Sequence, residues 1–140
     1  MQFGTVLDEG EDPTSPRVAS AAGPALAVVF HALYERNGPE AVDALPGGAR
    51  WRQSVEKQPA ESRHLAIHRG HLVAPNEHDL EGWAEVAPLV KSFSLTGTAS
   101  EIRDRLVEFE TAGVTEVAYQ PAGPDIGREL AAFAAAAGLG

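Results

Sequence analysis

The sequence predicts an α/β fold in which about three parallel strands are joined by helices. Residues 92–130 contain, in order, a strand pattern, a capped helix, a second strand pattern and the start of another helix. The connections are short, as in right-handed βαβ units, which place successive strands parallel in one sheet. A further strand pattern lies at residues 3–7, and we expect it to join the same sheet.

The first predicted strand, residues 3–7, is a short apolar run. It ends at four acidic residues, which are Asp8, Glu9, Glu11 and Asp12. Ligand sites of α/β proteins lie at the carboxyl ends of strands, so these carboxylates could bind a divalent cation. Their spacing lacks the regular alternation of a calcium loop, and runs of like charge are usually solvated. Both interpretations, a solvated loop and a cation site, stay open.

A helix is predicted over residues 16–34, because Ser15 or Thr14 can cap it and proline suits its first position. Residues 23–24 are Gly-Pro, and proline removes a backbone donor and crowds the preceding turn. We therefore expect a kink or a break near Ala22. Shorter helical segments are expected at residues 39–45 and 51–57, and a further helix at residues 79–90 with Asp79 as its cap.

Residues 61–79 carry four of the five histidines. His64, His68 and His71 have the spacing of one helical face, and His78 follows closely. Such a face can hold zinc or another first-row metal. The same residues also allow an extended conformation with a turn at 68–71, in which the imidazoles would not converge. Spacing without a carboxylate or Cys ligand is weak evidence for a metal, so we assign no metal ligand.

The clearest local signals lie between residues 93 and 119. Residues 93–95 and 114–119 have the composition and alternation of strands. Between them, Thr98 and Glu101 match a capping box, in which each side chain binds a backbone N–H at the start of a helix. Gly113 is expected to end that helix, since glycine takes the left-handed conformation without steric cost.

The carboxyl ends of these two strands form the other predicted ligand region. They carry Thr96, Gly97, Gln120, Pro121, Ala122 and Gly123. Glycine turns before a helix can leave backbone N–H groups for an anion, although ordinary turn chemistry also explains Gly97 and Gly123. Asp125, which is expected to begin a last helix that stops at Gly138, would oppose an anion. Gln120 could contact a ligand or cap backbone groups.

Three segments carry a resemblance to a known family. The closing part of luciferase-like flavin or deazaflavin oxidoreductases, which are TIM barrels, resembles GTASEIRDRLVEFETAGVTEVAYQPAGPDIGRELAAFA. Earlier segments of the same family resemble TVLDEGEDPTSPRVASAAGPALAVVFHALYE and RHLAIHRGHLV. Such barrels have roughly 250 residues, whereas this chain has 140. The resemblance therefore implies a partial TIM-barrel-like arrangement that corresponds to the carboxyl-terminal portion only.

The resemblance also implies a chemistry. It predicts an oxidoreductase or monooxygenase that uses FMN or the deazaflavin coenzyme F-420 on a small-molecule substrate, with the protein supplying orientation. His68 or His71 would then hydrogen-bond the substrate or polarise a carbonyl group. The cofactor would lie against Gly97, Gln120 and Gly123. The alternative is that these histidines and turns only shape the fold.

Composition limits the other classes of function. The net charge of −9 argues against nucleic acid and anionic lipid as partners. Cysteine is absent, which excludes disulfides and thiolate metal sites. No basic leader precedes an apolar segment, and no apolar run of about 18 residues is evident, so we expect no membrane span and a cytoplasmic location. Residues 1–140 are expected to form a single domain.

Three strands cannot close an eight-stranded barrel, so exposed strand edges are expected. We therefore expect a homo-oligomer or an amino-terminal partner chain. If the flavin prediction fails, the alternatives are a non-catalytic α/β association module and a histidine-cluster metal-binding protein.

Overall fold

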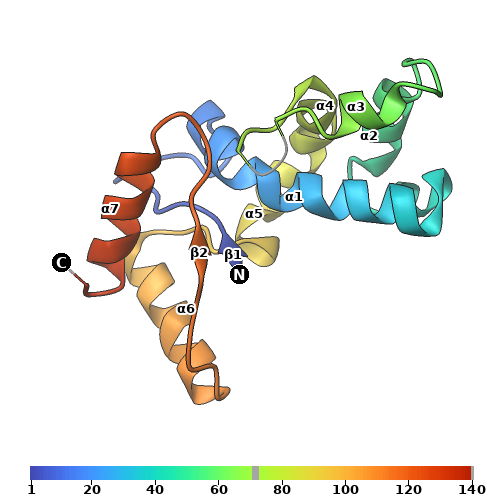
Figure 1. Ribbon diagram of the computed structural model, residues 1–140. Helices are drawn as coiled ribbons and strands as arrows, with labels where there is room; N and C mark the ends of the chain where they lie inside the picture. The colour runs from blue at the N-terminus through green and yellow to red at the C-terminus, as the bar shows by residue number, and fades with distance from the viewer. Residues whose placement is uncertain (71–72, 140) are drawn as a thin grey trace.

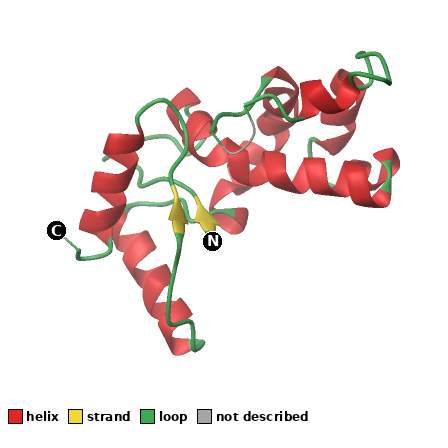
Figure 2. Ribbon diagram, in the orientation of Figure 1, coloured by secondary structure: helices red, strands yellow, loops and turns green. Residues whose placement is uncertain are grey.

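The protein is mostly helical, as the computed structural model in Figures 1 and 2 shows. The structure describes residues 1–70 and 73–139. Helices make up 60% and strands only 4% of these described residues. The elements in chain order are β1 (Gln2–Phe3), α1 (Pro16–Asn37), η1 (Pro39–Ala44), α2 (Gly48–Val55), α3 (Arg63–Ile67), α4 (Glu77–Val86), η2 (Ala87–Leu89), α5 (Val90–Phe93), α6 (Ala99–Thr111), β2 (Tyr119–Gln120) and α7 (Ile126–Ala136).

The expected three-stranded, partial TIM-barrel-like arrangement is wrong. The described residues contain one two-stranded parallel sheet, in which Gln2 pairs with Tyr119 and Phe3 with Gln120. On the other side of the first strand, a single parallel bridge joins Val6 to Gly97. The other elements of the described chain are helices. The local strand patterns therefore do not produce a sheet large enough to organise the fold.

Two of the predicted strands are shorter than expected: Leu95 and Gly97 keep backbone hydrogen bonds to the first strand segment, and Tyr119 lies in β2. Phe93 is helical and is the last residue of α5. Ser94 donates hydrogen bonds from its backbone N and from its hydroxyl to the Val90 carbonyl, which closes the last turn of this helix. Residues 114–118 are not assigned to a strand, although their composition favours one. A segment with strand composition forms a strand only where a neighbouring strand pairs with it. β1 lies beside this segment only at its carboxyl end.

The long helix α1 begins where the sequence predicts. The Ser15 side chain accepts a hydrogen bond from the backbone N of Val18, and Pro16 occupies the first turn. The break expected near Ala22 does not occur, since the helix continues to Asn37. The Pro24 side chain is fully buried, and this apolar burial offsets the hydrogen bond that proline removes.

Helix α4 starts earlier than predicted. Its N-cap is Asn76, whose side chain accepts from the backbone N of His78 and of Asp79. Asp79 is the third helical residue and returns a hydrogen bond to the Asn76 backbone N at 2.9 Å, which completes a capping box. The Asn76 amide also donates to the Ile67 carbonyl at 3.0 Å. Asn76 therefore joins the end of α3 to the start of α4.

The helix signals in the last third of the chain are confirmed. Thr98 and Glu101 form the predicted capping box of α6. Gly113 follows that helix with a φ of 86°. Asp125 caps α7 by accepting from the backbone N of Arg128 at 2.9 Å. Each of these signals acts within a few residues, so the local sequence specifies it.

The described hydrophobic residues form two clusters. The larger one is built by α1, α2, α4 and their neighbours around the fully buried Phe30 and Trp51, whose ring centroids lie 5.6 Å apart. The smaller one lies between α6, α7 and the segments that follow β1 and α5 (Figure 1). Its buried members are Val6, Leu95, Ile102 and Ala136. The lobe that carries the sheet thus has much less buried apolar surface than the helical lobe.

Helix α1 also bears on the membrane prediction. Within the described residues it is the one helix that is long and apolar enough to cross a membrane. Most of this apolar stretch, 61%, is buried inside the protein, as in a core helix.

Candidate functional site

Two arginines from different helices meet over the first strand. Nη1 of Arg17 donates to Thr5 Oγ1 at 2.9 Å and to Glu129 Oε1 at 2.8 Å. Nη1 of Arg128 donates to the same two atoms at 3.1 and 3.0 Å. Both Nη2 groups donate to the Val6 carbonyl. We call Thr5, Arg17, Arg128 and Glu129 the arginine network; it joins α1, the first strand segment and α7.

The core of this network is buried. The Glu129 side chain is 3% exposed, and it accepts a 2.6 Å hydrogen bond from Thr5 Oγ1. The arginines are accessible to solvent only in part, at 28% for Arg17 and 23% for Arg128. A buried carboxylate needs compensating charge and full hydrogen bonding, and the two guanidinium groups provide both. The Glu129 carboxylate therefore has both hydrogen-bond donors and compensating positive charge inside the protein.

The acidic run after the first strand is bound by the same arginines. Glu11 pairs with Arg17 through Nε at 2.8 Å and also through Nη2. The Arg17 guanidinium lowers the pKa of Glu11 to about 2. Asp8 accepts from Arg128 Nη2 at 2.6 Å. The Glu11 side chain is 13% exposed and is held by Arg17, whereas the Asp8 side chain stays 68% exposed, as in a solvated loop.

Tyr119 connects the sheet to α7. Its hydroxyl donates to the Gly4 carbonyl at 2.9 Å, and its ring stacks on Phe133 with centroids 4.1 Å apart. Burial, together with the nearby Glu129 carboxylate, raises the pKa of Tyr119 well above its usual value. Tyr119 thus stays protonated and acts as an anchor.

Two of the three predicted cofactor residues lie on opposite sides of the first strand. The Gly97 backbone N donates to the Thr5 carbonyl at 3.2 Å, while Gln120 pairs with Phe3 in the parallel sheet. Gly123 lies further away, against α1, and its N–H donates to the Val73 carbonyl at 2.8 Å. Gly97 and Gln120 therefore both lie toward the carboxyl end of the sheet, opposite Val6 and Phe3 respectively, while Gly123 lies apart from them against α1.

The predicted catalytic histidine belongs to a different part of the molecule. His68 follows α3, and its Nε2 lies 2.6 Å from Glu35 Oε1 of α1. Its ring also meets the edge of His31, at a centroid distance of 5.3 Å. His31 in turn contacts Asp79 Oδ1 at 3.0 Å, and that carboxylate accepts from Trp51 Nε1 at 2.9 Å. The arrangement ties α1, α2, α3 and α4 together.

The predicted catalytic and cofactor residues do not form one site. Gly123 lies beside Ala21 of α1, whereas His68 lies beside His31, about ten residues further along the same helix. At 1.5 Å per residue, the two α1 residues that they contact lie about 15 Å apart along the helix axis. His71, the second predicted catalytic residue, lies outside the described residues. In the described part of the chain, the histidine chemistry is thus separate from the strand ends.

The histidine metal site receives no support from the described residues. Among them, no group of three or more His, Asp or Glu side chains is placed to hold a metal ion. His78, which the sequence puts near the cluster, is buried on α4 and contacts Ser54 Oγ through Nδ1 at 2.8 Å. Its neighbours make it part of the packing between α2 and α4.

Sequence reasoning missed the arginine network. The sequence patterns assign no role to Arg17, Arg128 or Glu129. The one signal in the sequence that could have indicated the arginine network was the position of its residues at the starts of helices. Arg17 follows a helix start directly, and Arg128 and Glu129 lie in the first turn after Asp125. Both helices begin after a strand end, which is where side chains of α/β proteins meet.

Comparison of this chain with family models, with curated proteins and with solved structures gave no match. The resemblance to luciferase-like oxidoreductases therefore stays a prediction.

Proposed function

We propose that this chain is the carboxyl-terminal part of a flavin- or deazaflavin-dependent oxidoreductase and that it works together with an amino-terminal partner. The observation that supports this most is the position of Gly97 and Gln120 at the same end of a parallel sheet, on either side of the strand that carries Thr5. The carboxyl ends of parallel strands are where such folds bind their ligands.

The residues present fit the ring system of the cofactor but not its phosphate. The N–H groups of Gly97 and Gly123 already donate to carbonyl groups, and α6 and α7 are capped by Thr98 and Asp125. These groups are therefore not available to the phosphate of FMN or F-420. The side-chain amide of Gln120, in contrast, enters none of the described hydrogen bonds, so it is available to the polar edge of a ring system.

The division of tasks follows from this fit. When bound, a flavin or deazaflavin supplies the hydride chemistry. Gln120 would orient the ring edge, while the arginine network holds the strand and the two helices in place beneath it. The phosphate and the other face of the ring must be contacted by the partner. A small-molecule substrate would then bind between the two polypeptides.

The test is complementation between two polypeptides. The chain is purified alone and after co-expression with the amino-terminal half of a luciferase-like oxidoreductase, and each sample is dialysed against FMN or F-420. We expect the chain alone to retain neither cofactor and the complex to retain one, as measured by absorbance. Gln120→Ala should weaken retention about tenfold, or about 1.4 kcal/mol, whereas the exposed Gln53→Ala should not. A stable complex that retains neither cofactor would refute the proposal.

The second candidate is the non-catalytic association module. It is favoured by one observation, the exposed apolar segment before β2, where Val114 is 43% exposed. Exposed apolar segments of this kind often mark interaction surfaces. This candidate predicts a stable oligomer without a chromophore, which would survive His68→Ala because His68 lies away from that segment.

A further inference from the structure

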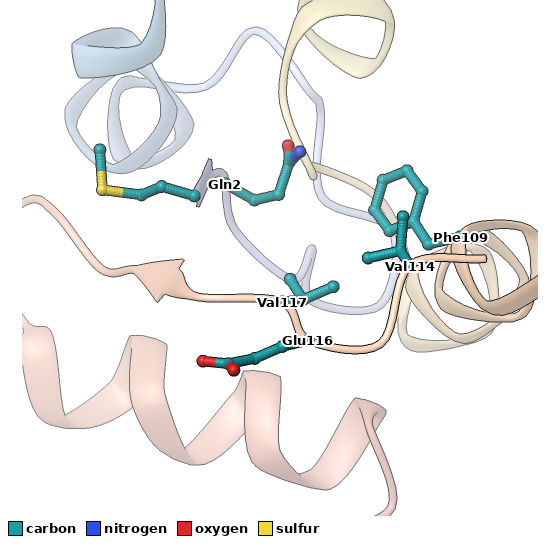
Figure 3. A pocket seen from close by; sticks show the side chains of 6 residues that line it. Gln2, Phe109, Val114, Glu116 and Val117 are labelled. Carbon is teal, nitrogen blue, oxygen red and sulfur yellow. The ribbon is translucent and has the colours of Figure 1, made fainter. Parts of the chain in front are cut away.

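Two hollows on the described surface differ in the charges that line them. The one in Figure 3 lies beside the start of β1 and contains Glu116 but no cationic side chain among its described lining residues. The other has a volume of about 270 Å³ and lies between the carboxyl-terminal end of α1 and α3. We call it the Arg63 hollow, and its lining is formed by Tyr34, Glu35, Ala60, Arg63, His64 and Ile67.

Within the described chain, the guanidinium group of Arg63 contacts neutral acceptors alone. Its Nη1 donates to the Tyr34 hydroxyl at 3.2 Å, and its Nη2 donates to the carbonyl groups of Gln58 and Glu56 at 3.2 and 3.4 Å. Its Nε is buried and has no hydrogen-bond partner among the described residues. A guanidinium group has five N–H donors and stays charged, so these contacts leave it without compensating negative charge.

The carboxylates around Arg63 are bound by other side chains. Glu35 lines the same hollow, and its Oε1 lies 2.6 Å from Nε2 of His68. Glu56, whose carbonyl contacts Arg63, binds Nη1 of Arg52 through its carboxylate at 3.0 Å. Among the described residues, no carboxylate forms an ion pair with Arg63. The hollow thus contains a half-buried cation whose charge the described chain does not neutralise.

We propose that the Arg63 hollow binds a small organic monocarboxylate. The ligand carboxylate accepts hydrogen bonds from Arg63, whose planar guanidinium group matches it in shape and charge, and His64 supplies a further N–H donor. The apolar part of the ligand lies against Ala60 and Ile67. This inference goes beyond the proposed function and does not rest on it, since none of the described lining residues belongs to the sheet or to α7.

Glu35 and the size of the hollow limit the ligand class. Because the Glu35 carboxylate lines the same hollow, each further negative charge on a ligand is repelled there. A phosphate group carries up to about two charges at neutral pH, whereas a carboxylate carries one. A cavity of about 150 Å³ holds benzene. The hollow of about 270 Å³ therefore admits a ring of that size together with its carboxylate.

The probe is sodium benzoate, added to the full chain at about pH 8, where histidine is neutral and benzoate is charged, while backbone amide shifts are followed by NMR. We expect saturable shifts in residues 34–35 and 60–67, with a Kd of about 1 mM. Benzamide, which has the same shape without the charge, should bind about tenfold more weakly, and Arg63→Gln should weaken benzoate about tenfold. The matched control is Arg36→Gln, since Arg36 is exposed on the same helix and does not line the hollow.

A second variant tests the hollow with its cation in place, in case Arg63→Gln does not fold. Glu35→Gln should tighten benzoate about threefold and admit inorganic phosphate, which the unaltered chain should exclude. Absence of saturable shifts at about 20 mM benzoate would overturn the proposal. Equal binding of benzamide, or equal losses in the Arg36 and Arg63 variants, would overturn the pairing of Arg63 with a carboxylate. None of these measurements uses a flavin, so failure of the proposed function would leave this proposal standing.

Discussion

Replacement of Glu129 by alanine is expected to reduce the free energy of unfolding by about 3 kcal/mol. The carboxylate accepts hydrogen bonds from Thr5, Arg17 and Arg128 at 2.6, 2.8 and 3.0 Å, and its side chain is 3% exposed. Removal of one partner from a buried ion pair typically costs about 3–5 kcal/mol. We expect the lower end, because Arg17 retains Glu11 and both arginines are about a quarter exposed.

The measurement is urea denaturation followed by circular dichroism, with the slope of the transition checked for each variant. Glu129→Gln keeps an acceptor oxygen and the side-chain volume, so it should lose less than Glu129→Ala. The matched control is Glu110→Ala, which removes an exposed carboxylate on α6 and should change stability by at most about 0.5 kcal/mol. If Glu129→Ala costs less than about 1 kcal/mol, the arginine network does not stabilise the fold and the reasoning is wrong.

Three further predictions concern single positions. The lowered pKa of Glu11 means that its pairing with Arg17 stabilises the fold above pH about 4.5 and is lost as the pH falls toward 2, so Glu11→Gln should flatten that part of the stability profile in denaturation series. Asn76→Ala should cost about 2–3 kcal/mol in thermal unfolding, because it removes a helix cap and leaves carbonyl groups of the preceding segment unpaired. Gly4→Ala should cost about 3 kcal/mol in urea denaturation, since its Cβ would lie 2.1 Å from the Leu95 carbonyl oxygen.

Local signals were sufficient wherever a structure is fixed by a few neighbouring residues. The capping box of Thr98 and Glu101, the cap at Ser15, the cap at Asp125 and the glycine after α6 could all be predicted. A cap satisfies backbone groups within one turn, so its partners are adjacent in the sequence. The start of α4 was misplaced because Asn76 and Asp79 are both good capping residues, three positions apart, and the reciprocal box between them was not recognised.

Non-local pairing decided what the local patterns could not. Residues 114–118 have strand composition but lie in no strand, because β1 reaches alongside them only at their carboxyl end. Pro24 does not break α1, because its side chain is buried in the core. A pattern of residues gives a preference of a fraction of a kcal/mol per residue, and a tertiary contact that buries a side chain outweighs it.

For the candidate site, the sequence by itself determined the chemistry of each residue and the helix ends that carry several of them. It placed Gly97 and Gln120 at strand ends, and the structure puts them at one end of the sheet. Only the tertiary structure decided that the α1 residues that His68 and Gly123 contact lie about 15 Å apart along the helix axis. It alone joined Arg17 to Glu129, which are 112 residues apart, because a buried carboxylate is stable only where the fold delivers charged partners to it.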